Sequence, residues 1–65
     1  FISCANNDIL ELAPLSVKIY QDWILADAKA ELHMYDKGGH GFGMTTQNSP
    51  VDNWSNLLVD WILSL

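Results

Sequence analysis

One histidine of this chain, His40, lies in a segment that contains all four glycines of the sequence, Gly38-Gly39-His40-Gly41-Phe42-Gly43. Glycine has no Cβ, so it tolerates positive φ angles and lets other groups approach the backbone closely. A rigid loop of this composition presents an imidazole to another group instead of burying it in the packing. A flexible turn that happens to contain a histidine has the same composition. The rest of the chain must decide between these interpretations.

The carboxylate of Asp8, which follows a strand-like segment as His40 does, favours the interpretation of a rigid loop that presents the imidazole. Asp8 follows one strand-like segment, Phe1 to Ala5, and His40 follows another, Glu31 to Tyr35. In an open parallel sheet, sites form outside the carboxyl ends of the strands, and neighbouring strands lie about 4.8 Å apart. Short loops can then bring the carboxylate and the imidazole into hydrogen-bond distance, where the carboxylate fixes the imidazole tautomer and stabilises the imidazolium. Alternatively, Asp8 only caps the backbone of its own turn.

The elements that must position these two residues alternate between strand and helix. Residues 1–5 form an apolar strand that ends at turn-forming Asn6 and Asn7. Between Ser16 and Asp27, apolar residues recur at helical spacing, and Pro14 suits a first helical turn. No glycine ends this helix, so Asp27 or Lys29 must close it. Residues 31–35 then alternate with a period of two, as in a strand.

A second helix is predicted after the glycine-rich segment. Ser49 suits the N-cap, Pro50 the first position and Asp52 the third, where its carboxylate reaches back to free N–H groups. Apolar residues then follow at steps of three and four: Val51, Trp54, Leu57, Leu58, Trp61, Ile62 and Leu65. We expect this helix to pack on the sheet as part of the core. A helical connection between two strands implies that they are parallel, so the fold class is α/β with the order β-α-β-α.

Composition limits the class of protein. The net charge of −5, with three lysines and no arginine, argues against binding to nucleic acid or to anionic membranes. No apolar stretch approaches the roughly 18 residues of a membrane span. The single Cys4 excludes an internal disulfide, and its spacing from His33 and His40 matches no metal site that we recognise. Neither a metal nor another cofactor is expected, and the compartment stays open.

The chain is also rich in apolar residues for its length. It has 65 residues, of which 49% are hydrophobic, and a domain of this size buries only about 60% of its surface on folding. The sequence starts with an apolar strand, without a preceding cap or turn. We therefore expect residues 1–65 to be a fragment of one larger domain, whose remaining part covers the apolar surface.

Several motifs together resemble the C-terminal end of an α/β-hydrolase fold enzyme of the acetylxylan-esterase-like or dienelactone-hydrolase-like kind. Such enzymes have an Asp-Asp-x-x-Val-Pro motif after a strand, a Ser-x-x-x-Tyr helix, a Glu-Leu-His-x-Tyr strand, Gly-Gly-His-Gly-Phe-Gly and a closing helix with Trp. The matching residues here are Asn7-Asp8, Ser16, Tyr20, residues 31–35, residues 38–43, Trp54 and Trp61. The resemblance covers nearly the whole chain and implies the last two parallel strands of that fold with their helices. It also implies that Asp8 is the acid and His40 the base of a catalytic triad, in the chain order known for this fold.

The sequence departs from the family pattern at four points. Asn7 replaces the first acidic residue, Glu11-Leu12 replaces Val-Pro, and Asp27 stands where a helix-ending glycine is usual. The Gly-x-Ser-x-Gly nucleophile motif and the oxyanion-hole segment, which lie upstream in this family, are absent. Triad members act as a unit, so an acid and a base without a nucleophile should catalyse little on their own.

The expected function is therefore hydrolysis of a small carboxylic ester by a serine hydrolase. This chain contributes Asp8 and His40, and its partner is the remainder of the hydrolase domain. A peptidase resembling the prolyl oligopeptidases is an alternative. So is a non-catalytic fragment that binds a partner through its Trp-bearing helix. A phosphate-binding loop is disfavoured because the segment lacks a G-x-G-x-x-G pattern, a following lysine and an adjacent helix.

Other residues of possible chemical interest have structural explanations. His33 shares a strand face with Tyr35 and is interpreted as packed or hydrogen-bonded. Cys4, within a strand, is interpreted as a small buried hydrophobe. Phe42 and Met44 could line a substrate pocket or support the underside of the loop, and the sequence is compatible with both roles.

Overall fold

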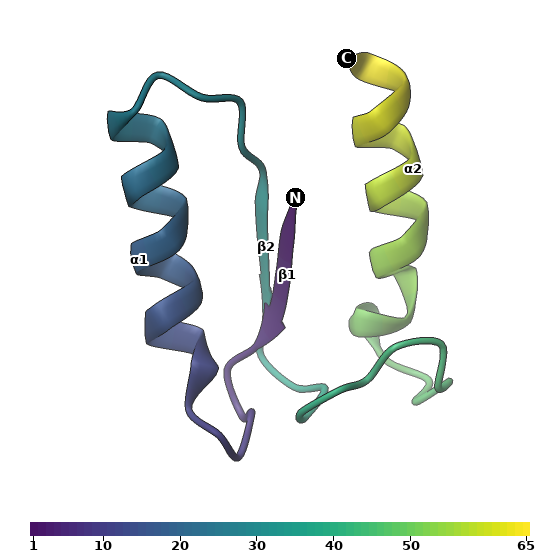
Figure 1. The fold of residues 1–65 in the computed structure, drawn as a ribbon. Helices are drawn as coiled ribbons and strands as arrows, with labels where there is room; N and C mark the ends of the chain where they lie inside the picture. The colour runs from purple at the N-terminus through teal and green to yellow at the C-terminus, as the bar shows by residue number, and fades with distance from the viewer.

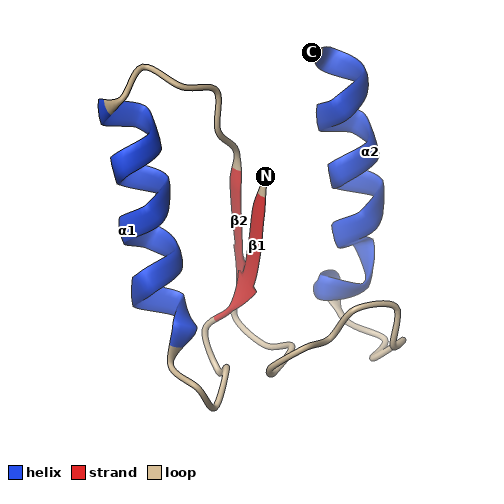
Figure 2. Cartoon of the chain, in the orientation of Figure 1, coloured by secondary structure: helices blue, strands red, loops and turns tan.

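The structure, a computed structural model, describes all residues 1–65 and shows an α/β arrangement. In chain order its elements are strand β1 (Ile2–Ala5), helix α1 (Leu12–Leu25), strand β2 (Leu32–Tyr35), a short 3₁₀ helix η1 (Pro50–Asn53) and helix α2 (Trp54–Ser64). The two helices lie on either side of the two strands (Figure 1, Figure 2). The predicted order of strand, helix, strand and helix is confirmed. No helix is long and apolar enough to span a membrane.

The two strands form a parallel pair, as the helical connection predicts. Ile2 is opposite Leu32 and Ala5 is opposite Tyr35. The pairing continues past the end of β1, because the backbone N–H of Asn6 donates to the carbonyl oxygen of Tyr35 at 2.6 Å. Both strands thus end at the same edge of the sheet, and the loops that carry Asp8 and His40 leave from this edge.

Helix α1 has Pro14 in its first turn, as the sequence predicts. It begins at Leu12, so Pro14 lies within its first turn, where a missing N–H leaves no hydrogen bond unmade. The helix ends at Leu25, and Asp27 takes a left-handed conformation with φ of 58°. The N–H of Asp27 donates to the carbonyl of Ile24 and that of Ala28 to the carbonyl of Trp23. This is the Schellman arrangement that glycine usually closes, and Asp27 holds the glycine position.

The last helical segment begins as a 3₁₀ turn, which the sequence did not predict. Ser49 is extended and Pro50 occupies the first position, as expected, but α-helical geometry starts only at Trp54. The Asp52 carboxylate accepts hydrogen bonds from the backbone N–H groups of Gln47 (2.8 Å) and Ser49 (3.4 Å). The predicted role of Asp52 is therefore confirmed. Because this carboxylate binds N–H groups that precede the turn, it also fixes the approach of the loop to the helix.

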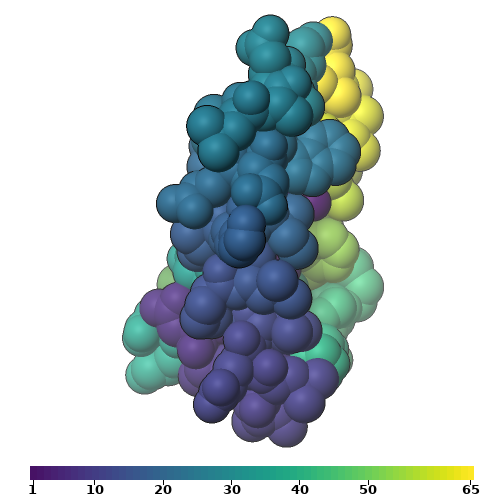
Figure 3. Space-filling view, turned by 60° about the vertical axis from the view of Figure 1, so that its left-hand side comes forward, coloured from purple at the N-terminus to yellow at the C-terminus, as the bar shows by residue number.

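The buried core is very small. Only Cys4, Ala5, Asp8 and Val51 are buried, and neither α1 nor α2 contains a buried residue. The prediction that the Trp-bearing helix is core is therefore wrong for this chain taken alone. Two aromatic pairs link helix α2 to the rest of the chain, with ring centroids 6.0 Å apart for Phe1 and Trp61 and 6.2 Å apart for Phe42 and Trp54. Figure 3 shows the outer surface of α1 with nothing packed over it.

Candidate functional site

Asp8 lies in the turn that links β1 to α1, and local hydrogen bonds set its position. Its N–H donates to the carbonyl of Ala5 at 3.2 Å, and its own carbonyl accepts the N–H of Glu11 at 3.0 Å. One carboxylate oxygen, Oδ1, accepts the N–H of Leu10 at 2.8 Å. This contact of a side chain with the backbone two residues on is the turn-stabilising role typical of aspartate. The turn-capping interpretation of Asp8 is therefore correct, but it accounts for only one of the two oxygens.

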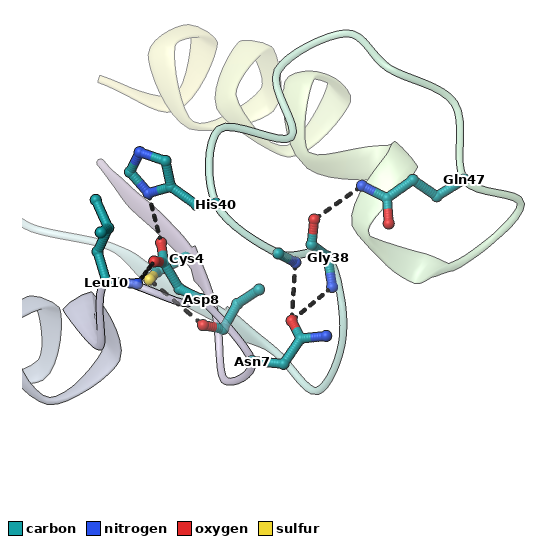
Figure 4. A network of polar contacts seen from close by, with 9 residues as sticks. Cys4, Asn7, Asp8, Leu10, Gly38, His40 and Gln47 are labelled. Atoms are coloured by element: carbon teal, nitrogen blue, oxygen red, sulfur yellow. Dashed lines mark hydrogen bonds and ion pairs between the residues drawn. The ribbon is translucent and has the colours of Figure 1, made fainter.

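The second oxygen faces His40. Asp8 Oδ2 lies 3.0 Å from Nδ1 of His40, a residue 32 positions further along the chain. The predicted contact between the two residues is thereby confirmed. Because an ionised carboxylate can only accept, Nδ1 carries the hydrogen of this bond. The ring nitrogen Nε2 points away from the carboxylate (Figure 4). The Asp8 side chain is 6% exposed and that of His40 is 45% exposed, so an oriented imidazole presents its free nitrogen to the outside.

The surroundings of Asp8 favour its charged form. Burial by itself raises the pKa of this carboxyl, but the backbone hydrogen bond from Leu10, the hydrogen bond from His40 and the charge of that ring together bring the pKa below its ordinary value. Asp8 is therefore a carboxylate at neutral pH. The negative charge of this carboxylate, next to Nδ1 of His40, keeps the proton on that nitrogen and stabilises the imidazolium that forms when Nε2 takes up a proton.

The backbone around His40 is held by side chains from three parts of the chain. Oδ1 of Asn7 accepts the N–H groups of Gly38 (3.0 Å) and Gly39 (2.8 Å). Nε2 of Gln47 donates to the carbonyl of Gly38 at 2.9 Å, as Figure 4 shows. The indole N–H of Trp54 donates to the carbonyl of Gly43. The loop is therefore fixed both before and after the histidine, which favours the interpretation of a rigid loop over that of a flexible turn.

Two properties of glycine are used in this loop. Gly39 and Gly41, on either side of His40, both have positive φ angles, 71° and 65°, which L-residues rarely adopt. Gly38 is needed for space, because a Cβ there would lie 3.0 Å from a methyl group of Val51 and 3.1 Å from the Cβ of Ala5. The loop can thus lie directly on the buried end of β1 and turn sharply on both sides of the imidazole.

An open cleft of about 460 Å³ adjoins the pair. It is lined by residues of β1, α1, the glycine-rich loop and α2, among them Cys4, Leu12, Phe42, Trp54 and Leu58, and by Asp8 and His40 themselves. Phe42 therefore belongs to the cleft wall, where its ring also packs edge-on against Tyr35 with the centroids 6.4 Å apart. Met44 does not line this cleft and is 80% exposed.

The remaining titratable candidates, His33 and Cys4, form no hydrogen bond with Asp8 or His40. His33 Nε2 lies 2.7 Å from Oε2 of Glu31, and its ring packs on Phe1 with the centroids 5.3 Å apart, in agreement with a structural role. Cys4 is 6% exposed, and the only hydrogen bond of its thiol is the one to the carbonyl of Ala5, at 3.7 Å. No three His, Cys, Asp or Glu side chains gather in a way that could hold a metal ion.

The sequence did not predict three of the residues that hold the loop. Asn7 was interpreted as a turn former, the segment with Gln47 as irregular, and Trp54 as part of an apolar face. The position of Asn7, next to Asp8 and just past a strand end, was the available signal, since a side chain there can reach the neighbouring loop. No comparable signal exists for Gln47.

Comparisons of the chain with protein-family profiles, with characterised proteins and with solved structures gave no match. The chemical interpretation of the site therefore depends on its geometry. A buried carboxylate that orients a half-exposed imidazole beside a cleft has the form of a general base, which can take a proton at Nε2 and return it.

Proposed function

We propose that this chain supplies the acid and the base of a serine-type carboxylic ester hydrolase, with Asp8 orienting His40. In this proposal, residues 1–65 correspond to the last two parallel strands and their helices in an α/β-hydrolase domain, and the nucleophilic serine belongs to the remainder of that domain. The single observation that carries the proposal is the 3.0 Å contact between Asp8 Oδ2 and His40 Nδ1, with Nε2 left free beside a cleft.

The proton transfers follow from this geometry. As the serine oxygen attacks the ester carbonyl, its proton passes to Nε2 of His40 while the new oxygen–carbon bond forms. His40 then gives this proton to the leaving alcohol as the old carbon–oxygen bond breaks. The same steps with water as the attacking group release the acid and restore the serine. Asp8 stays ionised throughout and stabilises the transient imidazolium.

The nucleophile has to come from elsewhere because the side chains of this chain do not provide one. No serine, threonine or cysteine side chain forms a hydrogen bond with His40, whose ring is hydrogen-bonded only to Asp8. The buried thiol of Cys4 contacts a backbone carbonyl instead. The resemblance of the motifs around Asp8 and His40 to the α/β-hydrolases supports a serine in this role.

The proposal is tested by replacing His40 with alanine in the full protein. We expect turnover of a p-nitrophenyl ester to fall by roughly 10⁴-fold or more, because the nucleophile then has no base. His33→Gln is the matched control, since the chain's other histidine contacts Glu31 and lies outside the cleft. This control should keep nearly full turnover. Near-normal turnover of His40→Ala, with the fold intact by circular dichroism, would contradict the proposal.

A related reaction is peptide hydrolysis by the same acid and base. The geometry of Asp8 and His40 serves either reaction, because both need one proton taken from the nucleophile and one given to the leaving group. Parallel assays with a p-nitrophenyl ester and a dipeptide amide separate the two. We expect the ester to be the better substrate, and a preference for the dipeptide would assign the chain to the peptidases.

A non-catalytic role in binding a partner protein is the second candidate. The observation that favours it is the exposure of large apolar side chains on both helices, including Trp23, Leu25, Ile62 and Leu63 at 52%, 84%, 53% and 79%. Exposed apolar surfaces of this kind mark interaction sites. If this role is the correct one, binding of the partner is insensitive to His40→Ala, whereas the hydrolase proposal requires His40.

A further inference from the structure

A residue next to Asp8 makes two of the hydrogen bonds that hold the loop carrying His40. Oδ1 of Asn7 accepts two backbone N–H groups at once, those of Gly38 at 3.0 Å and Gly39 at 2.8 Å. These contacts connect positions 31 and 32 residues apart in the sequence. In Figure 4 the Asn7 side chain lies under the loop, on the side away from the imidazole.

This arrangement couples the acid and the base through adjacent residues. Asn7 precedes Asp8 directly, and Gly39 precedes His40 directly. The turn between β1 and α1 therefore holds the loop backbone through Asn7 and the imidazole ring through Asp8. Gln47 binds the carbonyl of Gly38 at 2.9 Å, so the peptide units before His40 are held on both their donor and acceptor sides.

The chemical type of residue 7 matters as much as its position. Both an amide and a carboxylate oxygen can accept two N–H groups, but only the carboxylate adds a negative charge. A second negative charge beside Asp8 would favour the protonated imidazole, which cannot act as a base. Asn7 holds the loop without this electrostatic effect on His40.

We propose that Asn7 is a positioning residue for His40, which fixes the glycine-rich loop through Gly38 and Gly39 while leaving the imidazole free to accept a proton. This inference rests on the proposed function for its catalytic consequence, whereas its structural part stands on the two hydrogen bonds. Asn7 touches neither the imidazole nor the cleft, so it acts only through the loop.

Two substitutions in the full protein test this role. Asn7→Leu removes the acceptor, and we expect kcat to fall about 10²-fold at all pH values with KM nearly unchanged, as expected for a misplaced base. Asn7→Asp keeps the acceptor and adds a charge. We expect it to retain near-normal kcat/KM at high pH, with the acidic limb of the pH–rate profile moved up by about one unit. The control is Asn6→Leu, because the side chain of Asn6 makes no hydrogen bond.

Nuclear magnetic resonance provides readouts that do not depend on activity. In Asn7→Leu, the amide protons of Gly38 and Gly39 should exchange faster with solvent, whereas Asn7→Asp should keep their protection and raise the titration midpoint of the His40 imidazole. If the protein shows these changes but has no esterase activity, the loop role of Asn7 is supported and the proposed reaction is contradicted.

The inference is overturned if Asn7→Leu leaves both glycine amides protected, or if Asn7→Asp leaves the His40 titration and the acidic limb where they were. If Asn7→Leu does not fold, Asn7→Asp alone decides the result. A shifted acidic limb with protected amides supports the role, and an unshifted limb refutes it.

Discussion

The two oxygens of the Asp8 carboxylate have different partners, and this division fixes the direction of the imidazole. Oδ1 is held by the N–H of Leu10 at 2.8 Å, so Oδ2 has one position from which to accept Nδ1–H of His40 at 3.0 Å. An asparagine at this position could present its oxygen to only one of the two donors and would turn its NH₂ group towards the other. Both the turn and the imidazole tautomer would be affected.

Asp8→Asn in the full protein should therefore lower esterase turnover by about 10⁴-fold, because the imidazole loses its fixed tautomer and the stabilisation of its charged form. The matched control is Asp36→Asn, which removes an exposed carboxylate that makes no side-chain hydrogen bond. Ester turnover measured at pH 8 on both variants tests this expectation. Equal activity of the two variants would show that Asp8 serves only the turn.

The lowered pKa of Asp8 also makes a prediction about stability. A carboxyl with a lower pKa in the folded than in the unfolded protein stabilises the fold above the unfolded value of about 3.9. This contribution is lost as the pH falls through the folded value, which lies below the ordinary 3.8. Urea unfolding at pH 6 and pH 3 should show a smaller loss of stability for Asp8→Asn than for the unsubstituted protein. An equal loss in both proteins would show that Asp8 does not contribute to it.

At the scale of residues, the sequence was sufficient to predict that Asp8 and His40 lie in contact but not which side chains hold the loop around His40. Both residues follow strand ends, and the parallel pairing of β1 with β2 brings such positions to one edge. The bond from Gln47 to the carbonyl of Gly38 depends on where an irregular segment returns in space. No period or composition encodes that return, so only the folded chain reveals it.

At the scale of elements, helix α1 shows how a local motif can form with an unusual residue. The sequence predicts that Asp27 or Lys29 closes this helix, because no glycine follows it, and the structure shows Asp27 at φ of 58° in the Schellman position. Aspartate tolerates the left-handed region better than most residues, but glycine has no Cβ to oppose it. The start of the helix agrees with the prediction that Pro14 lies in its first turn, since the helix begins at Leu12.

Asp27→Gly should consequently stabilise the full protein by about 0.5–1 kcal/mol, the usual gain from relieving a left-handed non-glycine residue at a helix end. Asp27→Ala is the control, because it removes the same carboxylate and keeps the Cβ. Thermal unfolding followed by circular dichroism should rank the glycine variant above both the alanine variant and the unsubstituted protein. A glycine variant no more stable than the alanine variant would show that the conformation at residue 27 carries no cost.

At the scale of the whole molecule, the packing is too open for the number of apolar residues. The radius of gyration is 12.1 Å, compared with about 11 Å for a compact domain of this length. The accessible surface of 4646 Å² also exceeds the roughly 4,200 Å² expected for a folded monomer of this mass. With four buried residues, hydrophobic burial cannot offset the conformational entropy of ordering 65 residues.

The isolated 65-residue chain should therefore fold poorly. Hydrogen bonds such as those of Asn7 and Asp8 are exposed to competition from water unless apolar packing excludes it, and here both helices lie open on their outer sides. Circular dichroism of the isolated chain should show much less helix than the 14 and 11 residues of α1 and α2, without a cooperative thermal transition. A soluble, cooperatively folded 65-mer would instead favour the partner-binding role, because the apolar helix faces would then be stable without the covering part that the hydrolase proposal requires.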